Sequence, residues 1–392
     1  MLNLLPHLCW LHPGKLHTKV ERVGSGLHHG RHQPFGHLAR IVGRDRLVGT
    51  ERTGVGGIAL VHRSLILHQA RSHLTEPRPA DEHLGAGPTG FVLYRWMKKR
   101  GIDCIVVAPS RIPQSAGPHQ KTDRRDAIQL ARLHRAGELT AIHVPDETDE
   151  AIRDLTRARL DAVADRTRAR NRLKGFLLRH GHRYPGTANW SEAHMRYLRH
   201  LELPSPIHKS VLEEYLLTID QAIERVDRLE ALIEVRAPQW RFYPAVQALM
   251  CLRGFKLTAA TVLVAELGDV KRFAHPRQLM GFLGLVPKEN TTGRARRLGS
   301  ITKSGNVQAR WILIEAAHHA FHPPKVSEPL ALRQSGQPEP YKALPWKAQS
   351  RLHKRGWHLL KRGLMKQKVV TALARELAGF VWALLSQVPS PA

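Results

Sequence analysis

The sequence has few cysteines and no long apolar segment. Its three cysteines, Cys9, Cys104 and Cys251, lie far apart, so neither a disulfide framework nor a cysteine-based zinc site is expected, and a reducing cytoplasm fits. No apolar run reaches the roughly 18 residues that a membrane span needs, which argues against a membrane protein. The apolar start, Met1–Trp10, is interrupted by His7 and lacks a basic leading segment, so a signal peptide is not expected either.

Acidic residues are also scarce. Aspartate and glutamate number 33 against 61 lysines and arginines, which gives the 392-residue chain a formal net charge of +28. Such an excess indicates a polyanionic partner, with nucleic acid first and an acidic membrane surface as the weaker alternative. Hydrophobic residues make up 42%, which excludes a wholly disordered chain, and the length is typical of two or three domains.

Residues 1–84 differ in composition from the rest of the chain. They are crowded with histidine, glycine, arginine and proline, as in His28-His29 and Gly54–Gly57, and apolar periodicity is poor before Ile58. A disordered basic arm, or a stretch translated out of frame, explains this composition best. A metal site formed by the histidines is the alternative, although their spacing matches no common ligand pattern.

Regular structure can be predicted from residue 85 onward. Phe91–Arg100 has helical spacing and stops at Gly101, and Ile102–Ala108 is a β-branched run typical of a buried strand. A further helix is expected from Asp123 to about Arg135. This order of elements predicts an α/β domain over residues 85–145.

Two long helices are predicted next, over residues 146–180 and 209–234. Apolar residues of the second recur at steps of three and four, which is the pattern of a coiled-coil seam. They are Val211, Tyr215, Ile219, Ile223, Val226, Leu229 and Ile233. We therefore predict an antiparallel helical arm over residues 146–240. Residues 241–388 are predicted to form a mainly helical domain with loops at 287–305 and 323–345.

The first candidate site is Lys121–Ala127, with the sequence KTDRRDA. Asp123 and Asp126 are three residues apart on the predicted helix, so their carboxylates share one face. Paired carboxylate oxygens suit a hard divalent cation, and two-metal phosphoryl transfer is built from them. A structural role is the alternative, because Thr122 is a good cap and acidic residues in a first turn suit the helix dipole.

The second candidate is Cys251–Leu267, where a glycine turn separates two short apolar helices. The arrangement is similar to a helix-hairpin-helix element, whose backbone N–H groups can bind a phosphate. An ordinary pair of packed helices is the alternative.

The third candidate is the loop Glu289–Asn306, which places hydroxyls among guanidinium groups. A hydroxyl there could attack a phosphodiester while the neighbouring cations neutralise the developing charge. The alternative is a solvated basic loop that only touches the DNA backbone. The basic residues of the first and third candidates are the predicted nucleic-acid contacts: Lys121, Arg124, Arg125, Arg294, Arg296, Arg297 and Lys303.

Several segments occur together in one order. They are AGPTGFVLYRW (Ala86–Trp96), KTDRRDA, RAGELTAIHVPDE (Arg135–Glu147), RLKGFLLRHG (Arg172–Gly181), RQLMGFLGLVP (Arg277–Pro287), ITKSGN (Ile301–Asn306), WKAQSRL (Trp346–Leu352) and ARELAGFVWA (Ala374–Ala383). Each is weak alone, but the series resembles the DEDD-type insertion-sequence transposases of family 110 over about residues 85–388.

This resemblance implies a fold and an activity. The implied fold is α/β plus α: a partial RNase H-like domain related to Holliday-junction resolvases, a coiled-coil arm, and a helical C-terminal transposase domain with a serine nucleophile. The implied activity is DNA transposition, in which strands are cut and rejoined through a protein–DNA intermediate. The implied cofactor is Mg²⁺, and the implied partners are DNA, a structured guide RNA and further copies of the chain in a dimer or tetramer.

The residues of the implied active site are incomplete. The last two acidic positions of the family fall on Asp123 and Asp126, which would bind metal, but the place of its glutamate is taken by Gly85. Its first aspartate belongs within residues 1–84, where only Asp45 offers a poor match. The place of the serine is taken by Thr292.

Ser300 and Ser304 are the weaker candidates for the nucleophile. A disrupted reading frame that ends near Gly85 is the simplest explanation of the missing acidic positions. The leading prediction is therefore a transposase, in a degenerate copy. The alternatives are a catalytically inactive DNA- or RNA-binding remnant and, least favoured, an unrelated basic RNA-binding protein.

Overall fold

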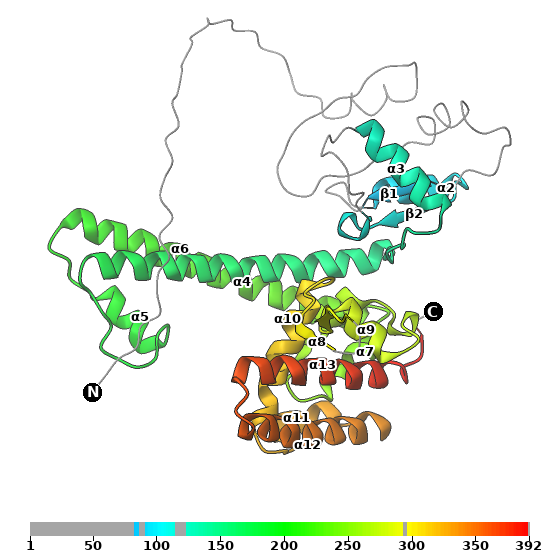
Figure 1. The fold of residues 1–392 in the computed structure, drawn as a ribbon. Helices are drawn as coiled ribbons and strands as arrows, with labels where there is room; N and C mark the ends of the chain where they lie inside the picture. The colour runs from blue at the N-terminus through cyan, green and yellow to red at the C-terminus, as the bar shows by residue number, and fades with distance from the viewer. Residues whose placement is uncertain (1–81, 86–90, 114–122, 293–295, 391–392) are drawn as a thin grey trace, which may run out of the picture.

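The computed structural model describes residues 82–85, 91–113, 123–292 and 296–390, and side chains throughout except those of residues 82–85, 110 and 123. The hypotheses for residues 1–84 therefore concern a segment that lies almost entirely outside the described residues. Within them the protein is mostly helical, with one parallel and one antiparallel pair of short strands (Figure 1).

The N-terminal unit contains a parallel strand pair joined through a helix. Strands β1 (Glu82–Gly85) and β2 (Cys104–Val107) pair from Glu82–Cys104 to Gly85–Val107, and α2 (Val92–Lys99) lies in the connection. Parallel strands need such a crossover. Met97 of α2 packs with Cys104 and Val106 in a small buried core. The strand predicted over residues 102–108 is confirmed, and β1 starts just before the predicted boundary at residue 85.

Helix α3 (Asp123–Arg135) is confirmed at the predicted residues. A single turn, η1 (Pro109–Arg111), leads toward it from β2. Ala127 and Leu130 form its buried face and pack on Ile112 and Leu139. The exposed face carries Arg124.

The arm consists of α4 (Glu147–Arg179) and α6 (Pro206–Arg236), which run antiparallel (Figure 1). Arg159 early in α4 pairs with Glu230 late in α6, and Asp165 farther along α4 pairs with Arg225. At the tip, α5 (Glu192–Arg199) closes the hairpin. Its apolar residues join those of both long helices in one core.

The C-terminal domain is built around two apolar helices. Residues 260–267 of α8 (Leu257–Leu267) are all buried, because that helix is apolar on every side and is surrounded by other elements. The last long helix, α13 (Lys366–Leu385), packs on α9, α10 and α12. The other elements are η2 (Ala237–Gln239), α7 (Tyr243–Met250), η3 (Val270–Arg272), α9 (Pro276–Phe282), α10 (Val307–Ala317), η4 (His318–Phe321), α11 (Glu328–Gln334) and α12 (Pro340–Lys361).

Two loop predictions in this domain are wrong. Residues 287–305 contain a hairpin, β3 (Pro287–Glu289) and β4 (Leu298–Ile301), whose side chains are mostly exposed and show no apolar alternation. Residues 323–345 contain α11 and the first turns of α12. Pro345 lies inside α12, although proline usually ends a helix.

None of the helices that the structure describes is both long enough and apolar enough to cross a membrane.

Candidate active site

The acidic pair lies at the start of α3. Asp123 is its first residue, and Asp126, half-buried, follows one turn later. Arg124 and Arg125 between them are exposed, whereas Lys121 lies outside the described residues. Carboxylates with this spacing suit a hard cation, but among the described residues no three metal-binding side chains converge.

The predicted nucleophile lies on the β3–β4 hairpin. Thr292 is exposed and directly follows Thr291, whose hydroxyl donates to Glu289 at 2.9 Å. Arg296, two residues before β4, donates to both oxygens of Glu289, at 3.1 and 3.3 Å. These two donors hold the pKa of the Glu289 carboxyl below its usual range. Glu289 therefore ties the two sides of the hairpin together beside Thr292.

The other predicted residues of this loop are also solvent-exposed. Ser300 lies on β4, and Ser304 donates its hydroxyl to Thr302 at 3.1 Å, so both lie toward the base of the hairpin. Arg297 and Lys303 are exposed as well, whereas Arg294 lies outside the described residues. Thr292 is thus the hydroxyl nearest the turn.

The base of the hairpin is fixed by two close backbone approaches. A Cβ on Gly284 would lie 2.1 Å from the carbonyl oxygen of Ser304, and a Cβ on Gly305 would lie 2.0 Å from that of Phe282. The buried guanidinium of Arg310 donates to the carbonyls of Leu283 and Ser304, at 2.8 and 3.3 Å. The two ends of the hairpin are therefore joined at a rigid base.

A buried carboxylate links this base to the arm. The side chain of Glu266 in α8 is 1% exposed and accepts two hydrogen bonds from Arg157 of α4, at 2.7 and 3.0 Å. It also accepts one from the amide of Asn306, at 2.6 Å, and the side-chain oxygen of Asn306 caps α10 by accepting from the amide N–H of Ala309. One acidic side chain thus holds an arm helix and the residue that follows the hairpin.

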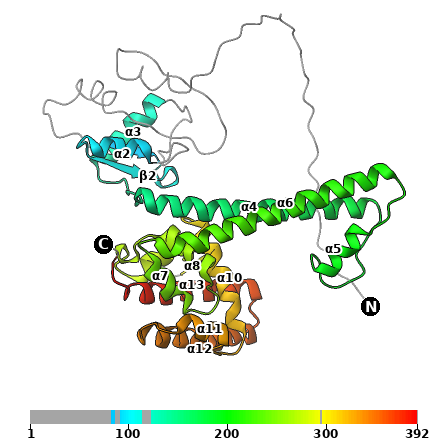
Figure 2. The same ribbon diagram turned by 180° about the vertical axis from the view of Figure 1, so that it is seen from behind.

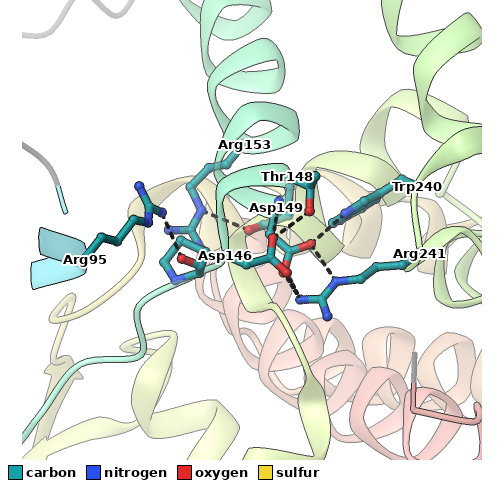
Figure 3. Close-up of polar contacts among 9 residues, drawn as sticks. Arg95, Asp146, Thr148, Asp149, Arg153, Trp240 and Arg241 are labelled. Carbon is teal, nitrogen blue, oxygen red and sulfur yellow. Dashed lines mark hydrogen bonds and ion pairs between the residues drawn. The ribbon is translucent and has the colours of Figure 1, made fainter. Parts of the chain in front are cut away.

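A second buried carboxylate fixes the start of the arm (Figure 3). Asp149, 5% exposed, accepts from the indole Nε1 of Trp240 at 2.8 Å and from Nε of Arg241 at 3.1 Å. Asp146 caps α4 by accepting from the amide N–H of Asp149 at 2.7 Å, and it also pairs with Arg241. Both ends of the arm hairpin therefore meet at one charged cluster.

The N-terminal unit is attached to the same place. Arg95 of α2 donates to the carbonyl of Pro145 at 3.0 Å and pairs with Glu150 of α4. Arg153, one turn on, donates to the carbonyl of Ala265 in α8 at 3.0 Å. Sequence reasoning missed this joint, which comprises Arg95, Asp146, Asp149, Glu150, Arg153, Arg157, Trp240, Arg241 and Glu266. The sequence did offer one signal, for Glu266. It is an acidic residue inside an apolar helix, and a carboxylate buried there needs a cation or hydrogen-bond donors as partners.

The structure favours packing as the role of the glycine turn between α7 and α8. Gly254 has a φ of +95°, and a Cβ there would lie 3.0 Å from the carbonyl oxygen of Ala316. Leu252 and Phe255 on either side are fully buried. The turn thus packs against the domain core.

The two sets of predicted catalytic residues come from different parts of the fold. Asp126 belongs to α3 of the N-terminal unit, and Thr292 belongs to the C-terminal domain. In both ribbon views α3 lies above α4, and helices α7 to α13 lie below it (Figures 1 and 2). The joint at the base of α4 is what connects them.

Comparisons with known proteins agree with this division. A family model described as Transposase IS116/IS110/IS902 family matches residues 246–330, and a second model, for the DEDD transposases of IS110, matches residues 85–181. The chain is 44% identical over 299 residues to y4qE of Sinorhizobium fredii, named as a transposase, covering 76% of this chain and 73% of that protein.

Other relatives carry the same kind of name. The chain is 34% identical over 278 residues to the transposase for insertion sequence element IS1533 of Leptospira borgpetersenii, covering 69% of this chain and 79% of that protein. It is 26% identical over 306 residues to the transposase for IS1111A of Coxiella burnetii, covering 75% and 74%. The segments that the two family models match contain α3, α4 and the hairpin. The chain belongs to the IS116/IS110/IS902 family of insertion-sequence transposases.

Proposed function

We propose that this transposase retains nucleic-acid binding and the strand-transfer hairpin but lacks a complete metal site. The observation that carries the proposal is the residue at the end of β1. The resemblance puts a glutamate at that place, and this chain has Gly85, paired with Val107 of β2. A site for two Mg²⁺ ions needs anionic ligands on both sides. Asp123 and Asp126 supply the anionic ligands on only one side of such a site.

In the proposed reaction the hydroxyl of Thr292 attacks a DNA phosphorus. The new threonine–phosphate ester forms as the phosphorus–oxygen bond to one sugar breaks, and that sugar leaves with the proton that Thr292 gives up. A hydroxyl of a second strand then attacks the same phosphorus and releases Thr292. Each step exchanges one phosphate ester for another, so no external energy source is required. The cations near the hairpin, Arg296, Arg297 and Lys303, would bind the phosphate oxygens.

The extra methyl of threonine crowds this attack relative to serine. We place this handicap second to the missing carboxylates, because a hydroxyl without its metal site has little to activate it. The RNase H-like fold, a guide RNA, the oligomeric assembly and the out-of-frame origin of residues 1–84 also belong to the proposal. They rest on the resemblance and on the change in composition at residue 85.

The test is guide-dependent joining of donor and target DNA in Mg²⁺. We expect no product from the unmodified chain, and recovery when an in-frame upstream strand with its aspartate is restored together with Gly85→Glu. Thr292→Ser alone should not recover activity. In the restored protein, Thr292→Ala should abolish the covalent protein–DNA intermediate, whereas Ser300→Ala and Ser304→Ala should leave it. Robust product from the unmodified chain would overturn the proposal, and retained activity after Asp126→Ala would show that the metal site lies elsewhere.

Binding is tested separately, without metal. We expect the logarithm of the affinity for DNA to fall with the logarithm of salt concentration at a slope of several units, because each neutralised phosphate releases counterions. Replacing Arg294, Arg296 and Arg297 by alanine should flatten this slope if the hairpin contacts the backbone. Binding that does not depend on salt would contradict this part of the proposal.

A further inference from the structure

Helix α12 has one buried face and one strongly basic face. Ala348, Gln349, Leu352 and Gly356 are buried, and a Cβ on Gly356 would lie 3.1 Å from a methyl of Leu373 in α13. The opposite face carries exposed basic side chains at steps of four and three: Lys347, Arg351, Lys354, His358 and Lys361. Neighbours at such steps share one side of a helix. The basic stripe is therefore about 21 Å long, at 1.5 Å per residue.

No nearby acidic residue neutralises most of this stripe. The sequence contains no aspartate or glutamate from Pro340 to Arg375. Glu376 of α13 pairs with Arg351 and Arg355 at one edge. Lys347, Lys354 and Lys361 form no ion pair with any residue in the described part of the chain.

The charge of α12 differs from that of the arm. Acidic residues outnumber basic ones on α6, where they are Glu213, Glu214, Asp220, Glu224, Asp227, Glu230 and Glu234. Both views place α12 on the far side of the C-terminal domain from the arm (Figures 1 and 2). Helix α12 is therefore strongly basic and lies apart from the acidic helix α6.

Two tryptophans lie along one edge of the stripe. Trp346 is 47% and Trp357 45% exposed. They are 11 residues apart, about three helical turns, so they lie on the same side about 16 Å from each other along the axis. Trp357 is held in place by a hydrogen bond from its Nε1 to the carbonyl of Phe321, 3.3 Å, and by the edge of the Phe321 ring. Large exposed rings beside lysines are typical of surfaces that bind unpaired bases.

We infer that the outer face of α12 binds a single-stranded nucleic acid, with Lys347, Lys354 and Lys361 on phosphates along the strand and Trp346 and Trp357 stacked on unpaired bases. Duplex DNA would satisfy the lysines but not the indoles, because its bases are stacked on one another. Neither contact reads the 2′-hydroxyl, so DNA and RNA strands of equal length should bind alike. The inference deepens the proposed function by assigning a surface for unpaired strands, and it does not depend on the metal site or on Thr292.

The first experiment measures fluorescence anisotropy of the full chain with a labelled oligothymidylate of about 15 nucleotides, in EDTA, over a range of salt. Converting Lys347, Lys354 and Lys361 to glutamine should lower the salt slope by about 2, since each phosphate contact on a single strand contributes about 0.7. The matched control removes three exposed cations of the acidic helix α6, through Lys209→Gln, Arg228→Gln and Arg236→Gln. This control should leave the slope unchanged.

The second experiment separates stacking from charge. Trp346→Ala should weaken binding of the oligothymidylate about tenfold without changing the salt slope, and Trp346→Phe should keep most of the affinity. The affinity for a duplex of the same length should be unaffected by either variant.

Equal weakening for duplex and single strand would show a purely electrostatic contact and overturn the inference, as would no effect of either set of variants. A large difference between oligothymidylate and oligouridylate would contradict the absence of sugar recognition. Because EDTA prevents catalysis, failure here is distinguishable from failure of the strand-transfer proposal.

Discussion

Oε1 of Glu266 lies 2.7 Å from Nε of Arg157, although the two residues are more than a hundred positions apart in the sequence. The carboxylate is buried, whereas the arginine side chain is half exposed. A third residue, Asn306, shares the second oxygen of Glu266. This contact makes the C-terminal domain and the arm one unit at the base of the hairpin.

Removing Glu266 should destabilise the protein strongly. Glu266→Ala leaves Asn306 and the half-exposed Arg157 without their acceptor, and the loss of hydrogen bonds to a buried charged group costs about 2 kcal/mol. We expect a corresponding loss in the free energy of unfolding measured with urea. The control is Glu224→Ala, which removes an exposed partner 3.8 Å from Arg228 and should cost less than about 0.5 kcal/mol. Equal losses for the two variants would contradict the role of Glu266.

The same carboxylate should make stability depend on acid pH. Burial opposes its ionisation, but hydrogen bonds from Arg157 and Asn306 outweigh it, so the pKa of Glu266 is lowered from 4.5. The unfolded chain then binds the proton more readily than the folded chain, and the stabilisation is present above about pH 4.5 and lost as pH falls below it.

Urea unfolding of the parent and of Glu266→Gln, from about pH 6 to about pH 3, measures this dependence. The difference between them should be largest near pH 6 and shrink below about pH 4.5. A difference that grows toward acid pH would show the opposite sign of linkage.

Asp149 and Arg241 should be energetically coupled. Asp149 is buried and accepts from both Arg241 and Trp240, so a double-mutant cycle of Asp149→Ala and Arg241→Ala should give a coupling of about 2 kcal/mol. Asp165 and Arg225, an exposed pair at 3.2 Å on the arm, provide the control and should couple by less than about 0.5 kcal/mol. Similar couplings in the two cycles would mean that the joint is no tighter than the arm surface.

The base of the hairpin should not tolerate a side chain at Gly305. Its φ is +83°, and an added Cβ would collide with the carbonyl of Phe282, so Gly305→Ala should cost well over 2 kcal/mol. Gly363 is the control: its φ is +80° and the space around its Cβ position is open, so a substitution there measures the cost of the backbone conformation alone. Gly363→Ala should cost about 1 kcal/mol, and thermal unfolding of the two variants would show the difference. Equal costs would mean that the collision at Phe282 is relieved without penalty.

Periodicity and termination signals predicted much of the fold. The helix at Asp123–Arg135 follows from its cap and the glycine after it, the strand at Cys104–Val107 from its β-branched run, and the second arm helix from its steps of three and four. These are local patterns that tertiary contacts reinforce rather than override.

The elements that were missed lack such patterns. The hairpin strands have exposed polar residues and no alternation, so nothing distinguished them from a loop. Pro345 suggested the end of a loop, but α12 begins only five residues earlier at Pro340, and the lost hydrogen bond falls near its first turns.

The joint depends on residues brought together from 50 to 112 positions apart. Arg157 and Glu266 carry no mutual sequence signal, and neither do Asp149 and Trp240. Spacing and the resemblance both singled out the carboxylates at Asp123 and Asp126, and the resemblance singled out Thr292 among the hydroxyls of the loop, but neither basis could place these groups in space. The cluster of charged side chains at the base of the arm connects the two parts of the fold that carry these residues, and it can be recognised only in the folded chain.

Helix α4 is 33 residues and about 50 Å long, and the hydrogen bonds of Asp149, Arg153 and Arg157 that tie it to the C-terminal domain all lie in its first third. The helix therefore extends from a fixed base, and a small rotation at that base is amplified along its length. A rotation of about 5° moves the far end by about 4 Å, which exceeds the reach of a hydrogen bond. The few hydrogen bonds and ion pairs at the base therefore determine the position of the tip of the arm.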